Sequence, residues 1–430
     1  PIPGAPELSD LLAALPETIS AAASAVATGQ VGTRSVPRIT LSLDVADSTL
    51  LHQAHRSSDW VITVDRTLGV EYFDNPSSAR RPDYIIDADA AEAEGLGHHV
   101  VISSRSVDEL RALLEPVLTR HGFQVETKHT AGFFDQLRLL SGQLAFKLAS
   151  AAHTQRTEVL GLVLARLYLD YQGVLTDQIL VPLDAHPELL REARRRADEV
   201  GESVGLQRTD LALFNLDARR RLITCRLVEV KCYSTLSAYE TLKDKIAMQL
   251  RRSEQRLAEH FDPHRTQPDR PDRVLRNAEL AALLRPYLSR AERYRTMRAD
   301  AVAEARWLLN CLDRGYRLEF TRTGLVFDLA GTGGSMEAEG GVEDHRIGRD
   351  LCQELIDAIP TELPSPDEPT VGSLSSLSLT LPRVEEAAFR APDRPHDVPE
   401  LGPPPEPEDV EEFEEVEDTE EAESSSALDE

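Results

Sequence analysis

Two β-prone stretches joined by a charged turn occupy residues 208–231, and this segment constrains the fold more than any other part of the chain. Its sequence is RTDLALFNLDARRRLITCRLVEVK. Apolar residues dominate both arms and the polar run DARRR separates them, so the segment predicts an antiparallel hairpin. In such a hairpin the start of the first strand lies beside the end of the second. We therefore expect Asp210 and Glu229 at the same end of one sheet.

The end of the second predicted strand carries alternating charged residues. Glu229 and Lys231 are two positions apart, so their side chains share one face of the strand while Val230 points to the other. Two carboxylates and one ammonium group are thereby gathered at one sheet edge. Carboxylates this close repel each other unless a cation lies between them, and hard oxygen ligands suit Mg²⁺ or Mn²⁺. The segment therefore predicts a divalent-metal site.

Helical patterns flank the hairpin on both sides. Residues 134–171 have apolar residues at helical spacing, with Glu158 inside the predicted helix. Residues 237–261 predict a long polar helix that contains Gln249-Leu250. An isolated Glu-Val-Lys tripeptide would be explained by an exposed, salt-bridged strand end. The ordered set of helix, two strands and helix favours a functional site instead.

This order of elements resembles the core of the PD-(D/E)XK nucleases. Many members of that family carry a Glu on the helix before the sheet, and RecB-type members carry Gln-Leu on the helix after the Glu-X-Lys strand. The Pro that often precedes the Asp is replaced by Thr209. The resemblance leaves open both a DNA endonuclease and a non-catalytic DNA-recognition and assembly module. It implies catalytic residues and metal ligands, which are Asp210, Glu229, Lys231 and Gln249 for catalysis and Glu158, Asp210 and Glu229 for the metal.

A longer part of the chain, about residues 38–330, resembles the region before the motor in HerA/FtsK-type ATPases. This resemblance is carried by the strings SDWVITVDRTLGVEYFD, HHVVISSRSVDEL and EVLGLVLARLYLDYQG. Among these ATPases, the chain resembles the DNA-phosphorothioation-dependent restriction subunit and related bacterial defence proteins. The resemblance implies three kinds of partner: DNA, a HerA/FtsK-type motor in cis or in trans, and other restriction subunits. The chain contains no GxxxxGK[ST] phosphate loop, so we expect either a fragment that precedes such a motor or a chain whose motor is a separate partner or absent.

Acidic residues are concentrated towards the C-terminal end. The formal net charge is -27, and residues 361–430 hold 22 of the 74 acidic residues but only three of the 47 basic ones, which leaves -8 for the rest. This balance argues against a nonspecific nucleic-acid coat but permits DNA binding in one groove. An acidic tail that occupies such a groove in place of DNA is a third interpretation. Two basic runs are candidates for phosphate contacts, with a solvated surface face as the alternative: Arg194, Arg195 and Arg196, and Arg219, Arg220 and Arg221.

The chain predicts an α/β fold in four parts. We expect a small α/β domain with a parallel or mixed sheet over 1–126, a PD-(D/E)XK-like mixed-sheet core over 127–262, a helical and strand extension over 263–335, and a disordered acidic tail rich in Pro, Ser and Glu over 336–430. Four cysteines without metal-ligand spacing fit a reducing cytoplasm. No run of eighteen apolar residues indicates a membrane span, so we expect no membrane partner.

Individual elements follow from local patterns. The first part predicts strands at 39–43, 60–64, 84–86 and 99–103 and a helix at 106–121. The core predicts a strand at 178–183 and a helix at 187–200 before the hairpin. The third part predicts helices at 275–288 and 291–312 and a final pair of strands at 317–320 and 324–329.

Overall fold

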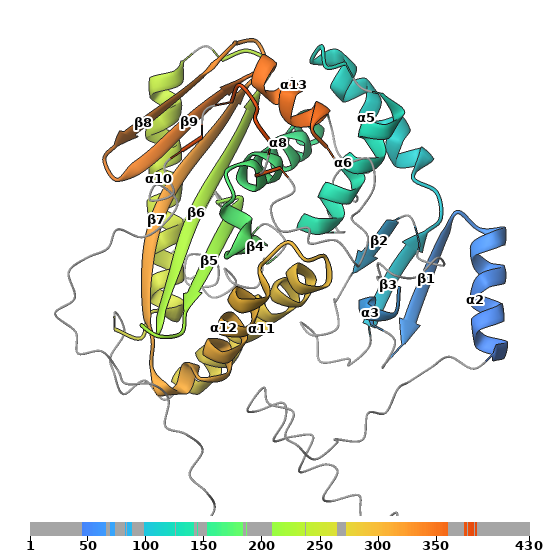
Figure 1. Cartoon of the computed structure of the whole chain (residues 1–430), viewed down its shortest axis with the longest axis horizontal. Helices are drawn as coiled ribbons and strands as arrows, with labels where there is room; N and C mark the ends of the chain where they lie inside the picture. Colours follow the sequence, from blue (N-terminus) through green and yellow to red (C-terminus); the bar gives the residue numbers. More distant parts are fainter. Residues whose placement is uncertain are drawn as a thin grey trace, which may run out of the picture. The chain divides into compact units, whose positions relative to one another are not determined.

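The computed structural model shows an α/β protein with two β-sheets, one of three strands and one of six (Figure 1). The predicted strand at 39–43, the predicted helix at 187–200 and the run Arg194–Arg196 lie outside the described residues. Described are residues 45–65, 69–73, 82, 84–87, 99–124, 126–141, 144, 153–183, 186, 209–236, 238–264, 272–359, 374–375, 377–381 and 383–384.

The smaller sheet has the order β1-β3-β2, and both of its strand pairs are antiparallel. The strands are β1 (Trp60–Asp65), β2 (Tyr84–Asp87) and β3 (His99–Ser104), as the sequence predicts. The expected parallel or mixed arrangement of this sheet is wrong. Ile62 and Val64 on the edge strand β1 are exposed, so this apolar run does not reflect burial on both faces. Helices α2 (Val45–Ser57) and α3 (Val70–Phe73) accompany the sheet.

The larger sheet is mixed and has the order β4-β5-β6-β7-β9-β8. The predicted hairpin is confirmed: β5 and β6 are antiparallel, and Leu211 lies opposite Val228. β6 pairs in parallel with β7, and β7 pairs in parallel with β9, while the outer pairs are antiparallel. The strands are β4 (Ile179–Pro182), β5 (Leu211–Asp217), β6 (Leu222–Tyr233), β7 (Arg317–Asp328), β8 (Gly334–Glu339) and β9 (Val342–Gly348).

The last two strands expected before residue 330 are in fact one strand, β7. The polar run Thr321-Arg322-Thr323, followed by Gly324, suggests a turn. Threonine is β-branched, however, and suits a strand. A glycine is tolerated inside a strand where neighbouring atoms approach closely. β7 lies between β6 and β9, near the centre of the sheet. The sheet therefore crosses the boundaries expected at 262/263 and at 335/336.

The prediction of a disordered tail from residue 336 is wrong for its first part. Residues 334–357 form β8, β9 and helix α13 (Arg349–Asp357). The helix buries an apolar face made by Leu351, Cys352, Leu355 and Ile356. The acidic composition of the whole segment 336–430 conceals this short amphipathic helix, because composition averages over ordered and highly charged stretches.

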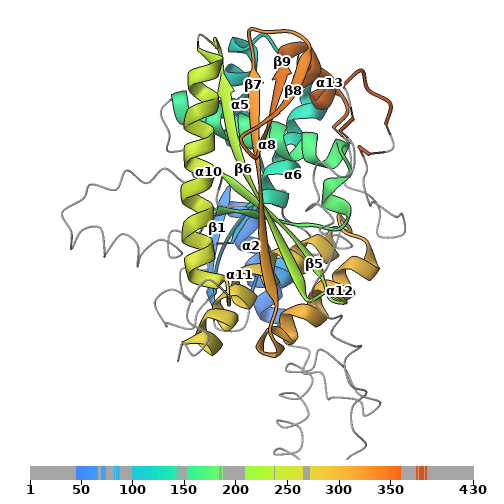
Figure 2. The ribbon, with the colours of Figure 1, turned by 90° about the vertical axis from the view of Figure 1, so that its left-hand side faces the viewer.

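Helices cover both faces of the larger sheet (Figures 1 and 2). On one face α8 (His153–Tyr171) packs against β6 and contacts α5 (Asp108–Arg120), α6 (Thr127–Leu140) and α13. On the other face the long helix α10 (Tyr239–Phe261) runs along β6 and β7, and α11 (Arg273–Arg293) and α12 (Ala299–Asn310) contact β4 and β5. Two short 3₁₀ turns, Val174–Thr176 and Leu312–Arg314, complete the described elements. The single helix predicted over 134–171 is therefore interrupted, because α6 ends at Leu140 and α8 begins at His153.

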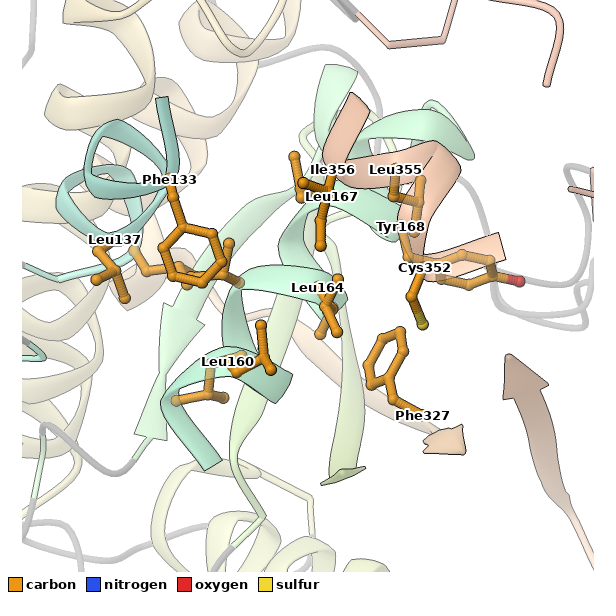
Figure 3. Packing of buried hydrophobic residues seen from close by; sticks show 14 of the residues in the cluster. Phe133, Leu137, Leu160, Leu164, Leu167, Tyr168, Phe327, Cys352, Leu355 and Ile356 are labelled. Atoms are coloured by element: carbon orange, nitrogen blue, oxygen red, sulfur yellow. The ribbon is translucent and has the colours of Figure 1, made fainter. Parts of the chain in front are cut away.

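A glycine allows α8 to approach the sheet closely. A Cβ atom at Gly161 would lie 2.9 Å from Cβ of Cys232 and 3.4 Å from Cγ1 of Val230. The same helix carries Leu160 and Leu164 into a large apolar cluster that it shares with α6, α13 and β7 (Figure 3). Tyr84 of β2 joins this cluster and meets Phe134 edge to face, with ring centroids 6.1 Å apart. The two sheets therefore share one hydrophobic core.

Two further expectations concern disulfides and membranes. All four cysteines are free thiols, and those at 225 and 352 are buried. Within the ranges given above, no helix has both the length and the apolar character needed to span a bilayer.

A piece of the expected tail, residues 374–384, packs onto α8 and α13. Leu374 and Leu381 are 1% and 3% exposed and belong to the main hydrophobic cluster. The Tyr171 hydroxyl donates a hydrogen bond to the Leu381 carbonyl at 2.8 Å, and the Val384 N–H donates to Oε1 of Gln172 at 2.9 Å. The prediction of disorder is wrong for this piece as well.

Truncation after Thr361 should lower the melting temperature by several degrees, because it removes two buried leucines from the main cluster. Each fully buried leucine contributes about 1.5–3 kcal/mol, and part of this is offset by the entropy of ordering the segment. Thermal unfolding followed by circular dichroism would measure the change. A chain that ends at Glu386 is the control, because it keeps every described contact of residues 374–384 and should unfold near the full-length temperature. Equal melting temperatures for the two truncations would contradict the packing of this segment.

Candidate active site

The hairpin brings together the three charged residues that the sequence singles out. Asp210 directly precedes β5, and its Oδ2 accepts a hydrogen bond from the Val230 N–H at 2.7 Å. Glu229 and Lys231 lie near the end of β6, and Nζ of Lys231 donates to Oε1 of Glu229 at 2.5 Å. The backbone register that places Leu211 opposite Val228 sets the first contact, and the two-residue spacing along β6 sets the second. The expected gathering of two carboxylates and one ammonium group is present.

Lys231 keeps its positive charge at neutral pH. Burial lowers the pKa of its ammonium group, but the charges of Asp210 and then Glu229 act in the opposite direction, and the net pKa is raised. Glu229 is fully buried, while the Lys231 side chain is 26% exposed. A buried carboxylate needs such a partner, because transfer of an isolated charge from water is costly. Lys231 is therefore a source of positive charge and not a proton acceptor.

Helix α10 covers this part of the sheet and places Gln249 above it. Ile246 packs over Gly324, the residue beside Glu229 on β7, and Oγ of Ser253 accepts a hydrogen bond from the Thr209 N–H at 3.2 Å. Gln249 lies between Ile246 and Ser253 on the buried side of the helix and is 9% exposed. The role expected for this glutamine at the site stays a prediction.

A row of acidic residues continues across the sheet from Glu229. In the strand register Glu229 neighbours Gly324, Gly324 neighbours Asp344 of β9, and Asp344 neighbours Glu337 of β8. Asp344 is 4% exposed, and its Oδ1 has no hydrogen-bond partner in the described part of the chain. A Cβ atom at Gly324 would overlap this oxygen, which explains a glycine in the middle of a strand.

The sequence did not reveal Asp344 as a site residue. Its segment belongs to the stretch expected to be a disordered tail, and no local motif surrounds it. The residue becomes visible only when β9 pairs with β7, because that pairing brings it beside Glu229 across one glycine. No signal in a single sequence reports such a parallel pairing.

Burial raises the pKa of Asp344 to about 6. The ammonium group of Lys243 opposes this shift, and three acidic side chains from the neighbouring hairpin and helix add to it, namely Glu337, Glu339 and Glu240. Lys243 is itself held by Glu240 at 2.8 Å and by Glu337 at 2.9 Å. Asp344 is therefore a carboxyl group that gives up its proton only near neutral pH.

Other predicted site residues lie elsewhere. Glu158 is exposed on α8, whose Gly161 meets Val230 and Cys232 on the opposite face of β6, so the expected third metal ligand is not gathered with Glu229. The turn arginines Arg219, Arg220 and Arg221 stand at the far end of the hairpin, where Asp217 pairs with Leu222. Seven strand residues separate the two ends, a distance of roughly 20 Å. These arginines therefore lie too far from Asp210 to contact a phosphate bound there.

The donor chemistry of the site fits Mg²⁺. Within the described ranges, no group of three or more His, Cys, Asp or Glu side chains is arranged to hold a metal ion. Mg²⁺ commonly uses only one or two carboxylates and completes its shell with water and substrate phosphate oxygens. Asp210 and Glu229 supply such a pair, on backbone fixed by the hairpin.

Replacing Lys231 tests its ion pair with the buried Glu229. Lys231→Met leaves Glu229 buried without its cation, so the free energy of unfolding should fall by about 3 kcal/mol, the lower end of the range for broken buried pairs. The double variant Lys231→Met/Glu229→Gln should recover part of this loss. Arg306→Met is the matched control, because it breaks a half-exposed pair with Glu292 and should cost about 1 kcal/mol or less. Equal losses in urea denaturation for Lys231→Met and Arg306→Met would contradict the buried pair.

The raised pKa of Asp344 predicts that replacing this residue with an uncharged one increases the stability of the fold, by an amount that depends on pH. In the unfolded chain this carboxyl ionises near its ordinary pKa of 3.8, and in the folded chain at about 6. The unfolded state therefore binds fewer protons between these values, and stability falls as pH rises from about 4 to 6. Asp344→Asn removes this penalty, so in metal-free buffer the variant should be more stable than wild type at about pH 8 and similar at about pH 4. Melting temperatures across this range would measure it, and Glu337→Gln, which neutralises an exposed neighbour, should show no such gain.

No family model, curated protein or solved structure matches this chain. The site is therefore defined by its residues and their geometry, without support from a relative.

Proposed function

We propose that this chain is a metal-dependent DNA endonuclease module with a PD-(D/E)XK-type site. The observation that carries the proposal is the joint placement of Asp210, Glu229 and Lys231 at one end of the β5–β6 hairpin, with Gln249 of α10 above them. The wider resemblance supports a role in bacterial restriction or anti-phage defence. Partners in that role would be DNA, a HerA/FtsK-type motor and other restriction subunits.

Asp210 and Glu229 would hold Mg²⁺ or Mn²⁺. When bound, such an ion lowers the pKa of a coordinated water and polarises a phosphoryl oxygen. The Val230 N–H orients the carboxylate of Asp210 before any ligand arrives. Such a preformed contact avoids reorganisation during the reaction.

Lys231 would stabilise negative charge as it develops on the scissile phosphate. Its ammonium group offers charge and hydrogen bonds to the phosphate oxygens, and the neighbouring carboxylates of Asp210 and Glu229 raise its pKa. Its partly exposed side chain lies between the buried Glu229 and solvent, from which DNA would approach. Gln249 would add amide donors and an acceptor that orient Lys231 or the DNA backbone.

One observation favours a second function, a non-catalytic DNA-recognition and assembly module for a translocase. Glu229 is fully buried and already bound to Lys231, and the described residues offer no three-ligand metal site. A site of this kind could persist as a structural ion pair. In that case DNA would be held by basic residues such as Arg219 and Arg220, which are exposed in the hairpin turn.

Plasmid cleavage in the presence of Mg²⁺ or Mn²⁺ tests the proposal, with and without phosphorothioate in the DNA. Asp210→Asn should lower the cleavage rate by roughly 100-fold or more, as expected when a group that acts on the transition state is altered. Lys231→Ala should do the same while DNA affinity stays within a few-fold of wild type. Asp217→Asn is the matched control, because it changes the same residue type at the other end of β5 and should leave cleavage unchanged.

Folding must be verified by circular dichroism, since Lys231→Ala leaves Glu229 buried. Asp210→Asn keeps an acceptor for the Val230 N–H and is the safer variant. Wild-type protein that binds DNA but never cuts it, with its motor partner and several divalent metals present, would decide for the recognition module. Loss of binding when the turn arginines are neutralised would support that outcome.

A further inference from the structure

The backbone that leads into Asp210 is held by three different elements. Oδ2 of Asp210 accepts the Val230 N–H from β6 at 2.7 Å, and its carbonyl oxygen accepts the N–H of Leu183, the residue after β4, at 3.0 Å. One position earlier, the N–H of Thr209 donates to Oγ of Ser253 on α10 at 3.2 Å. Asp210 is therefore fixed to two strand segments and, through Thr209, to a helix.

The bond between Thr209 and Ser253 differs from the other two because its acceptor comes from a helix. Both residues are buried, since Thr209 is 0% exposed and Ser253 is 8% exposed. A buried backbone N–H needs an acceptor, and an unpaired one costs the desolvation of the amide. The strand ladder of β5 begins at Leu211, after Thr209. Ser253 therefore supplies an acceptor at a position that lies before the ladder.

Ser253 is itself held against β7, a central strand of the sheet. Its neighbour Glu254 accepts a hydrogen bond from Nε of Arg322 on β7 at 2.6 Å. This ion pair is partly buried, because the side chains of Glu254 and Arg322 are 13% and 24% exposed. Ile246, two turns earlier on α10, packs against Gly324 of the same strand. Helix α10 is thus fixed to β7 at two points, so Ser253 is a firm anchor for the Thr209 amide.

The anchor depends on the residue that this chain has at position 209. Proline, which the nuclease resemblance would place before the aspartate, has no N–H and could not bond to Ser253. A proline ring restricts the backbone by itself, whereas threonine leaves φ unrestricted by a ring. The hydrogen bond to α10 therefore restrains the chain at the position where a ring would otherwise do so.

We propose that Ser253 is a positioning residue, which holds the Asp210 carboxylate in place for metal ligation through the Thr209 amide. This inference rests on the proposed function, because it takes Asp210 as a metal ligand. Groups that act in a reaction must be held within about 0.5 Å of the productive geometry. A ligand that moves further slows the reaction, with no matching loss of substrate binding. Ser253 acts through Thr209 and needs no contact with the metal or with DNA.

Ser253→Ala tests this role in the full chain. The change removes the acceptor and introduces a good helix former, so the protein should fold, which circular dichroism would verify. In plasmid cleavage with Mg²⁺, kcat should fall about tenfold or more while KM for DNA stays within a few-fold of wild type. Asn277→Ala is the matched control, because it breaks another buried hydrogen bond, to Asp313 near the turn end of the hairpin, and should leave kcat unchanged. Wild-type kcat in Ser253→Ala, or an equal loss in Asn277→Ala, would overturn the inference.

Amide hydrogen exchange at Val230 separates this inference from the proposed function. The Val230 N–H donates to the Asp210 carboxylate, so it exchanges with deuterium when that bond opens. In Ser253→Ala this exchange should be about tenfold faster or more, while amides in the first half of β6 keep their rates. Asn277→Ala should exchange like wild type at all of these amides.

Faster exchange at Val230 in Ser253→Ala, in a protein that never cuts DNA, would support the inference and contradict the nuclease proposal. Unchanged exchange at Val230 would overturn the inference whether or not DNA is cut. Cleavage by the wild type would in that case still leave the nuclease proposal standing.

Discussion

Strand β6 organises this structure, because both of its edges and both of its faces are occupied. Along its 12 residues it pairs in parallel with β7, and its first seven residues pair with β5. α8 packs on one face and α10 on the other. A strand covered in this way normally excludes charge. Glu229 is tolerated there because Lys231 accompanies it, so the candidate active site is a polar exception inside a well-buried strand.

The parts of the fold that depend on short-range patterns could be predicted. The turn DARRR and the apolar arms around it determine the β5–β6 register, and this register places Asp210 beside Val230. The same register sends Arg219 and Arg220 to the opposite end of the hairpin, a consequence that was already contained in the sequence. Helix α10 was likewise expected as a long polar helix over 237–261, and the structure has it at Tyr239–Phe261.

The parts of the fold that depend on pairing between separate strands could not be predicted from the sequence. β7 pairs in parallel with β6, which ends 84 positions earlier, and β9 pairs in parallel with β7, so nothing near Asp344 indicates that it lies one strand away from Glu229. Thr323-Gly324 resembles a turn because the reason for the glycine, the carboxylate of Asp344, lies on another strand. Leu374 and Leu381 belong to a short stretch of alternating leucines and small polar residues, and only the surface of α8 and α13 makes them part of the core. Composition describes averages, whereas these contacts depend on single side chains.

The parallel pairing of β6 with β7 also has a consequence for the order of folding. The β5–β6 hairpin closes a four-residue turn, whereas β7 begins 84 positions after β6 ends, with three helices between them. Closing the longer loop costs more chain entropy and is intrinsically slow. We therefore expect the hairpin to form first, and Glu229 and Lys231 to lose their water only when β7 and α10 dock. The ionic strength of the refolding buffer should then affect the late, rate-limiting docking step more than formation of the hairpin.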